Sequence, residues 1–176
     1  MKKNRFTTTQ LAIAGLMIAI TVILSYQNIY LFPPRSGRIT LRFIPMIFSG
    51  ILLGPTLGTI IGGASDPLIY FMTLGSPGMY FPGYMLTNMV IGFFPGLIIG
   101  KNIEKENKFS LILKVALISL LSFAVTIFLD SFWLSITRGK GFWYYVASRT
   151  LPNLIQMGIT FVAILVLTTR IKKTYR

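Results

Sequence analysis

The chain has 176 residues, of which 53% are hydrophobic and 12% are charged, about half the charged fraction of an ordinary soluble domain. Seventeen basic and four acidic residues give a net charge of +13, yet the mean hydropathy is +0.70. Neither Cys nor His occurs, which excludes disulfides, thiolate or imidazole catalysis, and zinc sites built on those side chains.

Long apolar blocks predict that the chain crosses a membrane several times, because about 20 apolar residues in a helix cross a bilayer. Proline and glycine interrupt these blocks at residues 32–38, 54–55 and 73–83, and the polar run KNIEKENK does so at 101–108. The predicted class is an all-α membrane protein, a single domain over residues 1–176 with six transmembrane helices in one bundle. The predicted spans are residues 10–31, 39–53, 56–72, 84–100, 109–134 and 146–169.

The basic residues predict the orientation, because cytoplasmic loops carry the excess of Lys and Arg. Eleven of the 17 lie near the two chain ends, in the 101–108 run or at Lys114, and six lie on the opposite side. Both termini are therefore predicted to be cytoplasmic. The high net charge then reflects topology, so no nucleic-acid partner is expected.

Six basic residues on the translocated side are more than membrane insertion requires. Guanidinium groups hold carboxylates or phosphates through two parallel hydrogen bonds, so these residues predict a site for an anionic solute. Contact with lipid head groups is the alternative. The six are Arg35, Arg38, Arg42, Arg138, Lys140 and Arg149.

A polar stripe follows the predicted sixth span, where Tyr145, Arg149, Asn153, Gln156 and Thr160 stand at steps of four, four, three and four. This is the spacing of one helical face. Gln156 lies about 16 Å below Tyr145 along such a helix, at a depth where an unpartnered amide is costly. A single amide can serve helix packing alone, but five polar residues favour a lined pocket.

Asp66 is the second pointer to a pocket. It follows the turn at 54–55 by about eleven residues, which places it near mid-membrane, where a carboxylate must be paired or protonated. Either it belongs to the pocket, or an ion pair with Arg149 or Arg42 merely holds the helices together. Asn88 is a further amide that can face inward.

Asp130 is expected close to the outer surface, paired with Arg138 or Lys140. Its estimated depth differs from that of Asp66 by half a membrane, too far for two carboxylates to share a proton. An intramembrane aspartyl enzyme is therefore rejected, and the chain is predicted not to be an enzyme and to bind no metal or cofactor.

Small residues recur at every fourth position in three of the predicted spans. Such faces let helix backbones approach closely, either inside the bundle or against a partner membrane protein, and the first span is the better candidate for the partner. No P-loop is present, so uphill transport must be driven by another protein. The small residues are Gly54, Gly58 and Gly62, Gly92, Gly96 and Gly100, and Gly15 with Ala19.

Two segments resemble a known family. The run LRFIPMIFSGILLGPTLGTIIGGASD at 41–66 and the run GMYFPGYMLTNMVIG at 78–92 are similar to the substrate-binding S components of energy-coupling factor (ECF) vitamin transporters, most of all to the folate-specific branch. The resemblance implies a multi-pass protein of a bacterial plasma membrane that binds its vitamin near the outer face. It also implies a transmembrane coupling subunit and two cytoplasmic ATPase subunits as partners, with Gly15 and Ala19 on the coupling face.

Folate suits these residues, because its pterin needs hydrogen-bond donors, acceptors and a stacking plate while its glutamate tail carries two carboxylates. The predicted readers of the pterin edge are Asp66, Asn88, Asn153 and Gln156. The predicted stacking residues are Tyr80, Phe81 and Trp143, although interfacial aromatic residues are often only belt anchors. The predicted carboxylate ligands are Arg35, Arg38 or Arg149. Riboflavin, thiamine or pantothenate is the alternative vitamin, and a self-sufficient carrier is the alternative mechanism, although no inverted repeat is visible.

Overall fold

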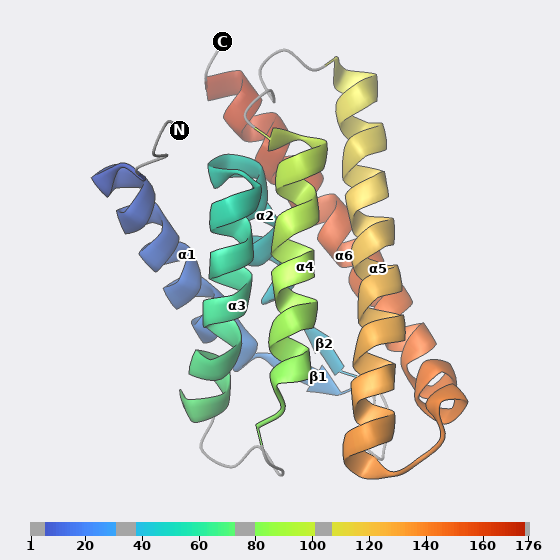
Figure 1. Cartoon of the computed structure of the whole chain (residues 1–176). Coiled ribbons are helices and arrows are strands. Elements are labelled where there is room, and N and C mark those ends of the chain that lie inside the picture. The colour runs from blue at the N-terminus through green and yellow to red at the C-terminus, as the bar shows by residue number, and fades with distance from the viewer. Residues whose placement is uncertain (1–5, 31–37, 73–79, 101–106, 175–176) are drawn as a thin grey trace.

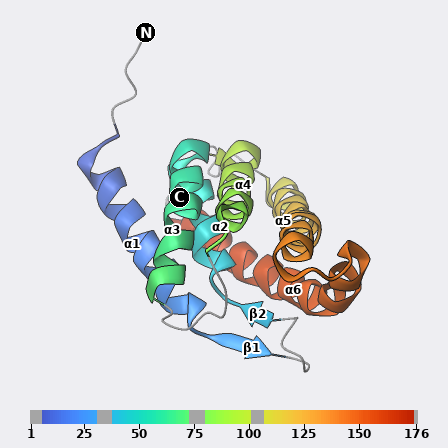
Figure 2. The same cartoon turned by 60° about the horizontal axis from the view of Figure 1, so that its bottom comes forward.

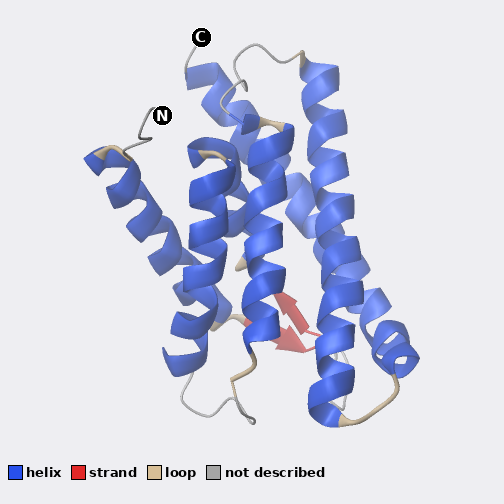
Figure 3. Ribbon diagram, viewed as in Figure 1, coloured by secondary structure: helices blue, strands red, loops and turns tan. Residues whose placement is uncertain are grey.

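The computed structural model describes residues 6–30, 38–72, 80–100 and 107–174, which form six helices and one two-stranded antiparallel sheet (Figures 1 and 3). The helices are α1 (Thr8–Ser25), α2 (Phe43–Leu53), α3 (Pro55–Met72), α4 (Pro82–Ile98), α5 (Lys108–Arg138) and α6 (Phe142–Thr174). The strands are β1 (Asn28–Tyr30) and β2 (Arg38–Thr40), with Ile29 opposite Ile39. The sheet was not predicted from the sequence.

The helices form one bundle around α2, which contacts α1, α3, α4 and α6 (Figure 2). Helices α3 and α4 lie side by side, α5 follows α4, and α6 crosses behind them (Figure 1). The beginning of α1 and the end of α6 lie at one end of the bundle, while the sheet and the α5–α6 turn lie at the other, here called the sheet end.

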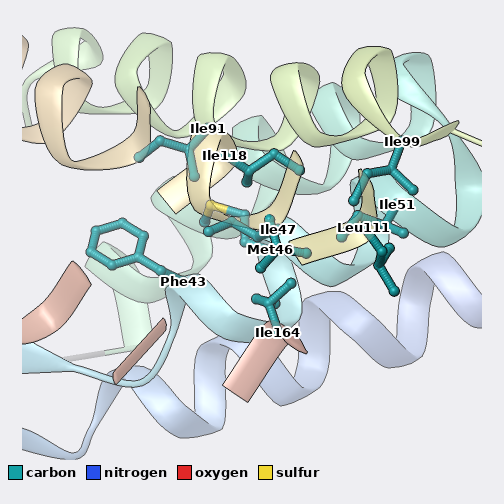
Figure 4. Packing of buried hydrophobic residues seen from close by; sticks show 10 residues of the cluster. Phe43, Met46, Ile47, Ile51, Ile91, Ile99, Leu111, Ile118 and Ile164 are labelled. Carbon is teal, nitrogen blue, oxygen red and sulfur yellow. The ribbon is translucent and has the colours of Figure 1, made fainter. Parts of the chain in front are cut away.

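The core forms where α2 meets α4, α5 and α6 (Figure 4). Helix α2 has 11 residues, about 16 Å of helix, so it is shorter than the predicted span 39–53. Pro45 lies in its first turn, where a proline is tolerated, and Arg38–Thr40 form a strand instead. The buried cluster contains Phe43, Met46, Ile47, Ile51, Ile91, Ile99, Leu111, Val115, Ile118 and Ile164.

Large apolar side chains also cover the outside of the bundle. Phe109 is 79% exposed and Leu113 is 63% exposed on α5, and Val162 is 59% exposed on α6. Contiguous apolar surface of this kind is costly in water and favourable against lipid. Helix α1, helix α5 and the α6 segment Phe142–Lys172 are long and apolar enough to cross a membrane. The fold is therefore a helical bundle with the surface of a membrane protein.

Helices α3 and α4 touch along their backbones. A Cβ atom at Gly58 would collide with the carbonyl oxygen of Gly92, and one at Gly62 would collide with the carbonyl oxygen of Asn88. These glycines and the side chains of Asp66 and Asn88 make up the α3–α4 seam. Gly58, Gly62, Gly92 and Gly96 thus close the bundle internally, which was one of the two predicted roles, whereas a Cβ at Gly54 or Gly100 would meet nothing within 4 Å.

Candidate functional site

The polar stripe of α6 faces the inside of the bundle, as its spacing predicted. Tyr145, Asn153, Gln156 and Thr160 are each at most 7% exposed, and the Arg149 side chain is 14% exposed. The apolar residues Leu151, Leu154 and Ile155 between them are exposed. The helix therefore turns its polar face to protein and its apolar face outward.

A second polar stripe on α5 faces the first. Ser119, Ser122, Thr126 and Asp130 stand at steps of three, four and four, again the spacing of one helical face. Ser119, Thr126 and Asp130 are at most 6% exposed. We call the two stripes together the α5–α6 seam. The α5 stripe has a periodic pattern in the sequence, but hydroxyl residues are so common in apolar helices that this pattern alone did not predict a polar face.

A small cavity opens between α2, α5 and α6, and its volume of about 20 Å³ has room for one water molecule. Six of its ten lining residues are polar and none is charged. The lining residues are Phe43, Ile47, Ser119, Ser122, Phe123, Thr126, Asn153, Gln156, Met157 and Thr160. A neutral polar group, rather than an ion, matches this lining.

Gln156 ties the sheet to the wall of the cavity. Its Oε1 accepts a hydrogen bond from the backbone N–H of Thr40 at 2.7 Å, and its Nε2 donates to Thr160 Oγ1 at 3.2 Å. Both ends of this amide are therefore in use. The predicted burial of Gln156 is explained by a fixed contact between β2 and α6.

The part of the α5–α6 seam nearest the sheet end holds an ion pair. Arg149 Nη2 lies 3.1 Å from Asp130 Oδ2 and donates a hydrogen bond to it. The prediction that Asp130 pairs with Arg138 or Lys140 was wrong. The turn between α5 and α6 places both cations at the exposed tip of the bundle. Arg149 Nη1 is buried and has no hydrogen-bond partner among the described residues.

Asp66 has its partners in the α3–α4 seam and at the start of α2. Asn88 Nδ2 donates to Asp66 Oδ1 at 2.7 Å, and Arg42 Nη1 lies 4.0 Å from the same oxygen. The ion pair with Arg42, one of the alternatives for Asp66, is thus confirmed. All three residues are at most 8% exposed, so this cluster holds α2, α3 and α4 together.

Known proteins resemble this chain over most of its length. A family model described as "ECF-type riboflavin transporter, S component" matches residues 5–173. The chain belongs to this family of S components. It is 29% identical over 164 residues to a protein named "Folate transporter FolT" from Clostridium novyi (strain NT), a match that covers 93% of this chain and 88% of the relative.

Solved structures share the fold of this S component. A crystal structure of FolT bound with folic acid matches with a TM-score of 0.75 and 25% identity, covering 93% of this chain and 95% of that one. The S component for biotin from an ECF-type ABC transporter matches with a TM-score of 0.65 and 23% identity, covering 97% of this chain and 95% of that one. The S component of a bacterial ECF transporter matches with a TM-score of 0.62 and 15% identity, covering 96% of this chain and 98% of that one. The last two establish the fold alone.

The predicted aromatic residues of this S component separate into two groups. Tyr80 packs against Tyr70, with ring centroids 5.2 Å apart, and Phe81 packs against Trp133 at 5.5 Å. Both therefore lie at the sheet end near α3, α4 and α5 (Figure 1). Trp143 is 75% exposed and does not line the cavity. Tyr80 and Phe81 thus pack on different rings, and neither of them lines the cavity.

Two predicted arginines of this S component are only partly covered by the structure. Arg35 lies outside the described residues, and Arg38 is described as the first residue of β2 without its side chain. Among the residues described, no three carboxylates come together in a group that could hold a metal ion. The described site residues offer hydrogen bonding, ion pairing and ring stacking.

Tyr80 carries a phenol in this region whose ionisation is suppressed. Burial, and after it the charge of Asp66, raises the pKa of Tyr80 above its ordinary value. Its hydroxyl is buried and meets no hydrogen-bond partner in the part of the chain that is described. A neutral phenol remains a hydrogen-bond donor at physiological pH.

Proposed function

We propose that this S component captures folate at the outer face of the cell membrane and delivers it as part of an ECF-type importer. The observation that carries the proposal is the likeness, over 93% of the chain, to a folate transporter and to a structure of FolT bound with folic acid. The site agrees chemically, because uncharged polar groups line the cavity while an arginine with an unused nitrogen lies about one helical turn farther out.

Each part of folate then has a place along the α5–α6 seam. Asn153 and Gln156 line the cavity and face the pterin. Arg149, four residues before Asn153 on the same face, takes a carboxylate of the glutamate tail, joined from the sheet end by Arg35 or Arg38. Tyr80 and Phe81 stack on the rings at the entrance. Asp66 and Asn88 already bond to each other, so they read the pterin only by exchanging that bond.

The membrane arrangement follows from the charges and from the two ends of the bundle. We propose that all six helices lie across the membrane, that both termini are cytoplasmic, and that the sheet end faces outward (Figure 1). Lys108, Lys114 and Arg170 lie toward the proposed cytoplasmic end, in keeping with the excess of basic residues on that side of a membrane.

The proposed importer includes a transmembrane coupling subunit and two cytoplasmic ATPase subunits. The exposed small residues of α1 support a coupling face there, because Gly15 and Ala19 are both exposed and a Cβ at Gly15 would meet nothing within 4 Å. A partner helix can approach such a surface closely. Replacing Gly15 with Trp is expected to abolish transport in the assembled complex while leaving vitamin binding intact.

Riboflavin is the second candidate, favoured by the description of the matching family. Isothermal titration of the purified protein with folate, riboflavin, thiamine and pantothenate separates the candidates. We expect folate to bind most tightly. Folate binding that is micromolar or weaker, beside tighter binding of another vitamin, would end the folate proposal. Uptake into liposomes by this chain alone, without ATPase subunits, would replace the importer with a self-sufficient carrier.

The role of Arg149 is tested by shortening the ligand. Arg149→Gln should weaken folate binding at least tenfold, because a hydrogen bond to a charged group contributes about 1.5–3 kcal/mol, and should hardly affect a pterin that lacks the glutamate tail. The matched control is Lys140→Gln, which removes an exposed cation at the same end of the bundle. Equal losses for both ligands would assign Arg149 to the fold instead.

A further inference from the structure

Two of the polar groups that line the cavity are fully buried and have no assigned bond. Gln156 uses both ends of its amide, and Thr126 donates its hydroxyl to the backbone carbonyls of Ser122 and Phe123. Asn153 Nδ2 and Ser119 Oγ, in contrast, are buried without a hydrogen-bond partner among the described residues. Asn153 is 7% exposed and Ser119 is 3% exposed, so solvent at the surface does not satisfy them.

Ser119 lacks the hydrogen bond to its own helix that the buried serines Ser49 and Ser65 make. Ser49 donates to the carbonyl of Met46 at 2.7 Å, and Ser65 donates to that of Ile61 at 2.6 Å. This bond to the preceding helical turn is the usual way to satisfy a hydroxyl inside an apolar helix. Ser119 makes no such bond in the described structure, so its proton remains available to a group in the cavity.

We infer that Ser119 and Asn153 form a two-donor subsite for an acceptor on a neutral heteroaromatic ring, and that one water fills it in the ligand-free protein. The cavity volume of about 20 Å³ suits a single water. Hydroxyl and amide N–H groups both donate, so an acceptor in the cavity that both residues line would satisfy them. The absence of any charged lining residue excludes a carboxylate as the occupant.

The chemical class is therefore a ring that carries a lactam edge, whose carbonyl oxygen has two lone pairs and can accept from both donors. This inference rests on the proposed vitamin-binding function, but the pterin of folate and the isoalloxazine of riboflavin share the lactam edge. The subsite is thus independent of which vitamin binds. A ring edge is larger than one water, so Phe123 and Met157, two half-buried lining residues, must move apart to admit it.

The test compares variants that remove one donor each without changing the size of the site greatly. Ser119→Ala and Asn153→Leu are titrated with folate and with riboflavin in detergent, and their thermal unfolding is recorded without ligand. We expect each substitution to raise the Kd for the vitamin that the wild type binds by about tenfold, or about 1.4 kcal/mol. The unfolding temperature without ligand should stay close to that of the wild type, because each change removes a buried donor together with its hydrogen bond to the water, and loss of both is close to neutral for stability.

The matched controls remove polar groups that do not line the cavity. Ser135→Ala lies on α5 and Thr150→Val lies on α6, and both hydroxyls bond only to their own helix. Neither should change affinity. Unchanged affinity in both Ser119→Ala and Asn153→Leu would overturn the subsite, as would an equal loss in the controls. If the wild type binds riboflavin and not folate, the folate proposal fails while the same two variants still test the subsite.

Discussion

The two helical seams of the bundle handle buried polar groups differently. In the α3–α4 seam the backbones touch through Gly58 and Gly92, and Asp66 bonds Asn88 directly across it. In the α5–α6 seam polar side chains occupy the space between the helices and leave a cavity. Asp66 and Asn88 thus use each other as partners, whereas Asn153 and Ser119 line a cavity and have no hydrogen-bond partner among the described residues.

The largest expected effect concerns Asp66. Asp66→Ala removes both the counter-charge 4.0 Å from Arg42 and the acceptor of the Asn88 amide. Loss of one partner from a buried ion pair costs about 3–5 kcal/mol, so a large drop in the thermal unfolding temperature is expected. Asp66→Asn keeps an acceptor and should lose less.

Ligand binding by Asp66→Asn tests whether the two seams differ in function. If Asp66→Asn abolished folate binding at an unchanged unfolding temperature, the carboxylate would belong to the ligand site, and the two seams would share one function. Titration of Asp66→Asn beside Asn153→Leu decides this, because the first should mainly lower stability and the second should mainly lower affinity.

The next effect concerns backbone contact. In Gly92→Ala the added Cβ would collide with the carbonyl oxygen of Gly58, and relieving the collision requires the two backbones to part. Overpacking of this kind costs about 3 kcal/mol. Gly158→Ala is the control, since a Cβ there meets nothing within 4 Å. Equal unfolding temperatures for the two variants would contradict backbone contact in the α3–α4 seam.

Sequence reasoning was strongest where apolar blocks are long. The segments predicted at 56–72, 84–100 and 109–134 appear as α3 (Pro55–Met72), α4 (Pro82–Ile98) and α5 (Lys108–Arg138). The stripe on α6 was found as well, because a periodicity of about 3.6 residues survives in any straight helix. Both successes depend on local patterns alone.

The failures concern contacts between distant segments. The strands β1 and β2 have three residues each, too short for an alternating pattern. Asp130 has nearer cations in the sequence than Arg149, and only the antiparallel packing of α5 against α6 selects the true partner. Ser119 was overlooked because its lack of a bond to its own helix is visible only in coordinates.

A smaller effect is expected at the junction of the sheet and α6. Gln156→Leu removes the acceptor of the buried Thr40 N–H, which costs about 1–2 kcal/mol when no other acceptor replaces it. Hydrogen exchange measured by mass spectrometry should be faster in peptides that contain residues 38–42. Unchanged exchange would mean that the sheet is held by other contacts, and that the cavity wall does not depend on this bond.

The smallest effect is expected at Tyr80. Because burial and Asp66 raise the pKa of this phenol above 10.0, the folded protein holds the proton more tightly than the unfolded chain does. The resulting stability is fully present below pH 10 and is lost as the pH rises through the raised pKa. Tyr80→Phe lacks this dependence and also removes a buried hydroxyl without an assigned bond, so its stability near pH 7 should stay within about 1 kcal/mol of wild type.

Thermal unfolding at about pH 8 and about pH 11 measures the difference. The unfolding temperature of Tyr80→Phe should exceed that of the wild type only at the higher pH. If the unfolding temperatures of the two proteins change equally with pH, the Tyr80 hydroxyl is in contact with water, and the space between Tyr80 and Asp66 is open to solvent. Tyr80 would then offer a ligand an accessible hydroxyl next to the α3–α4 seam. In that case both seams could bind a ligand, and they would differ only in how readily their buried carboxylates and amides exchange hydrogen-bond partners.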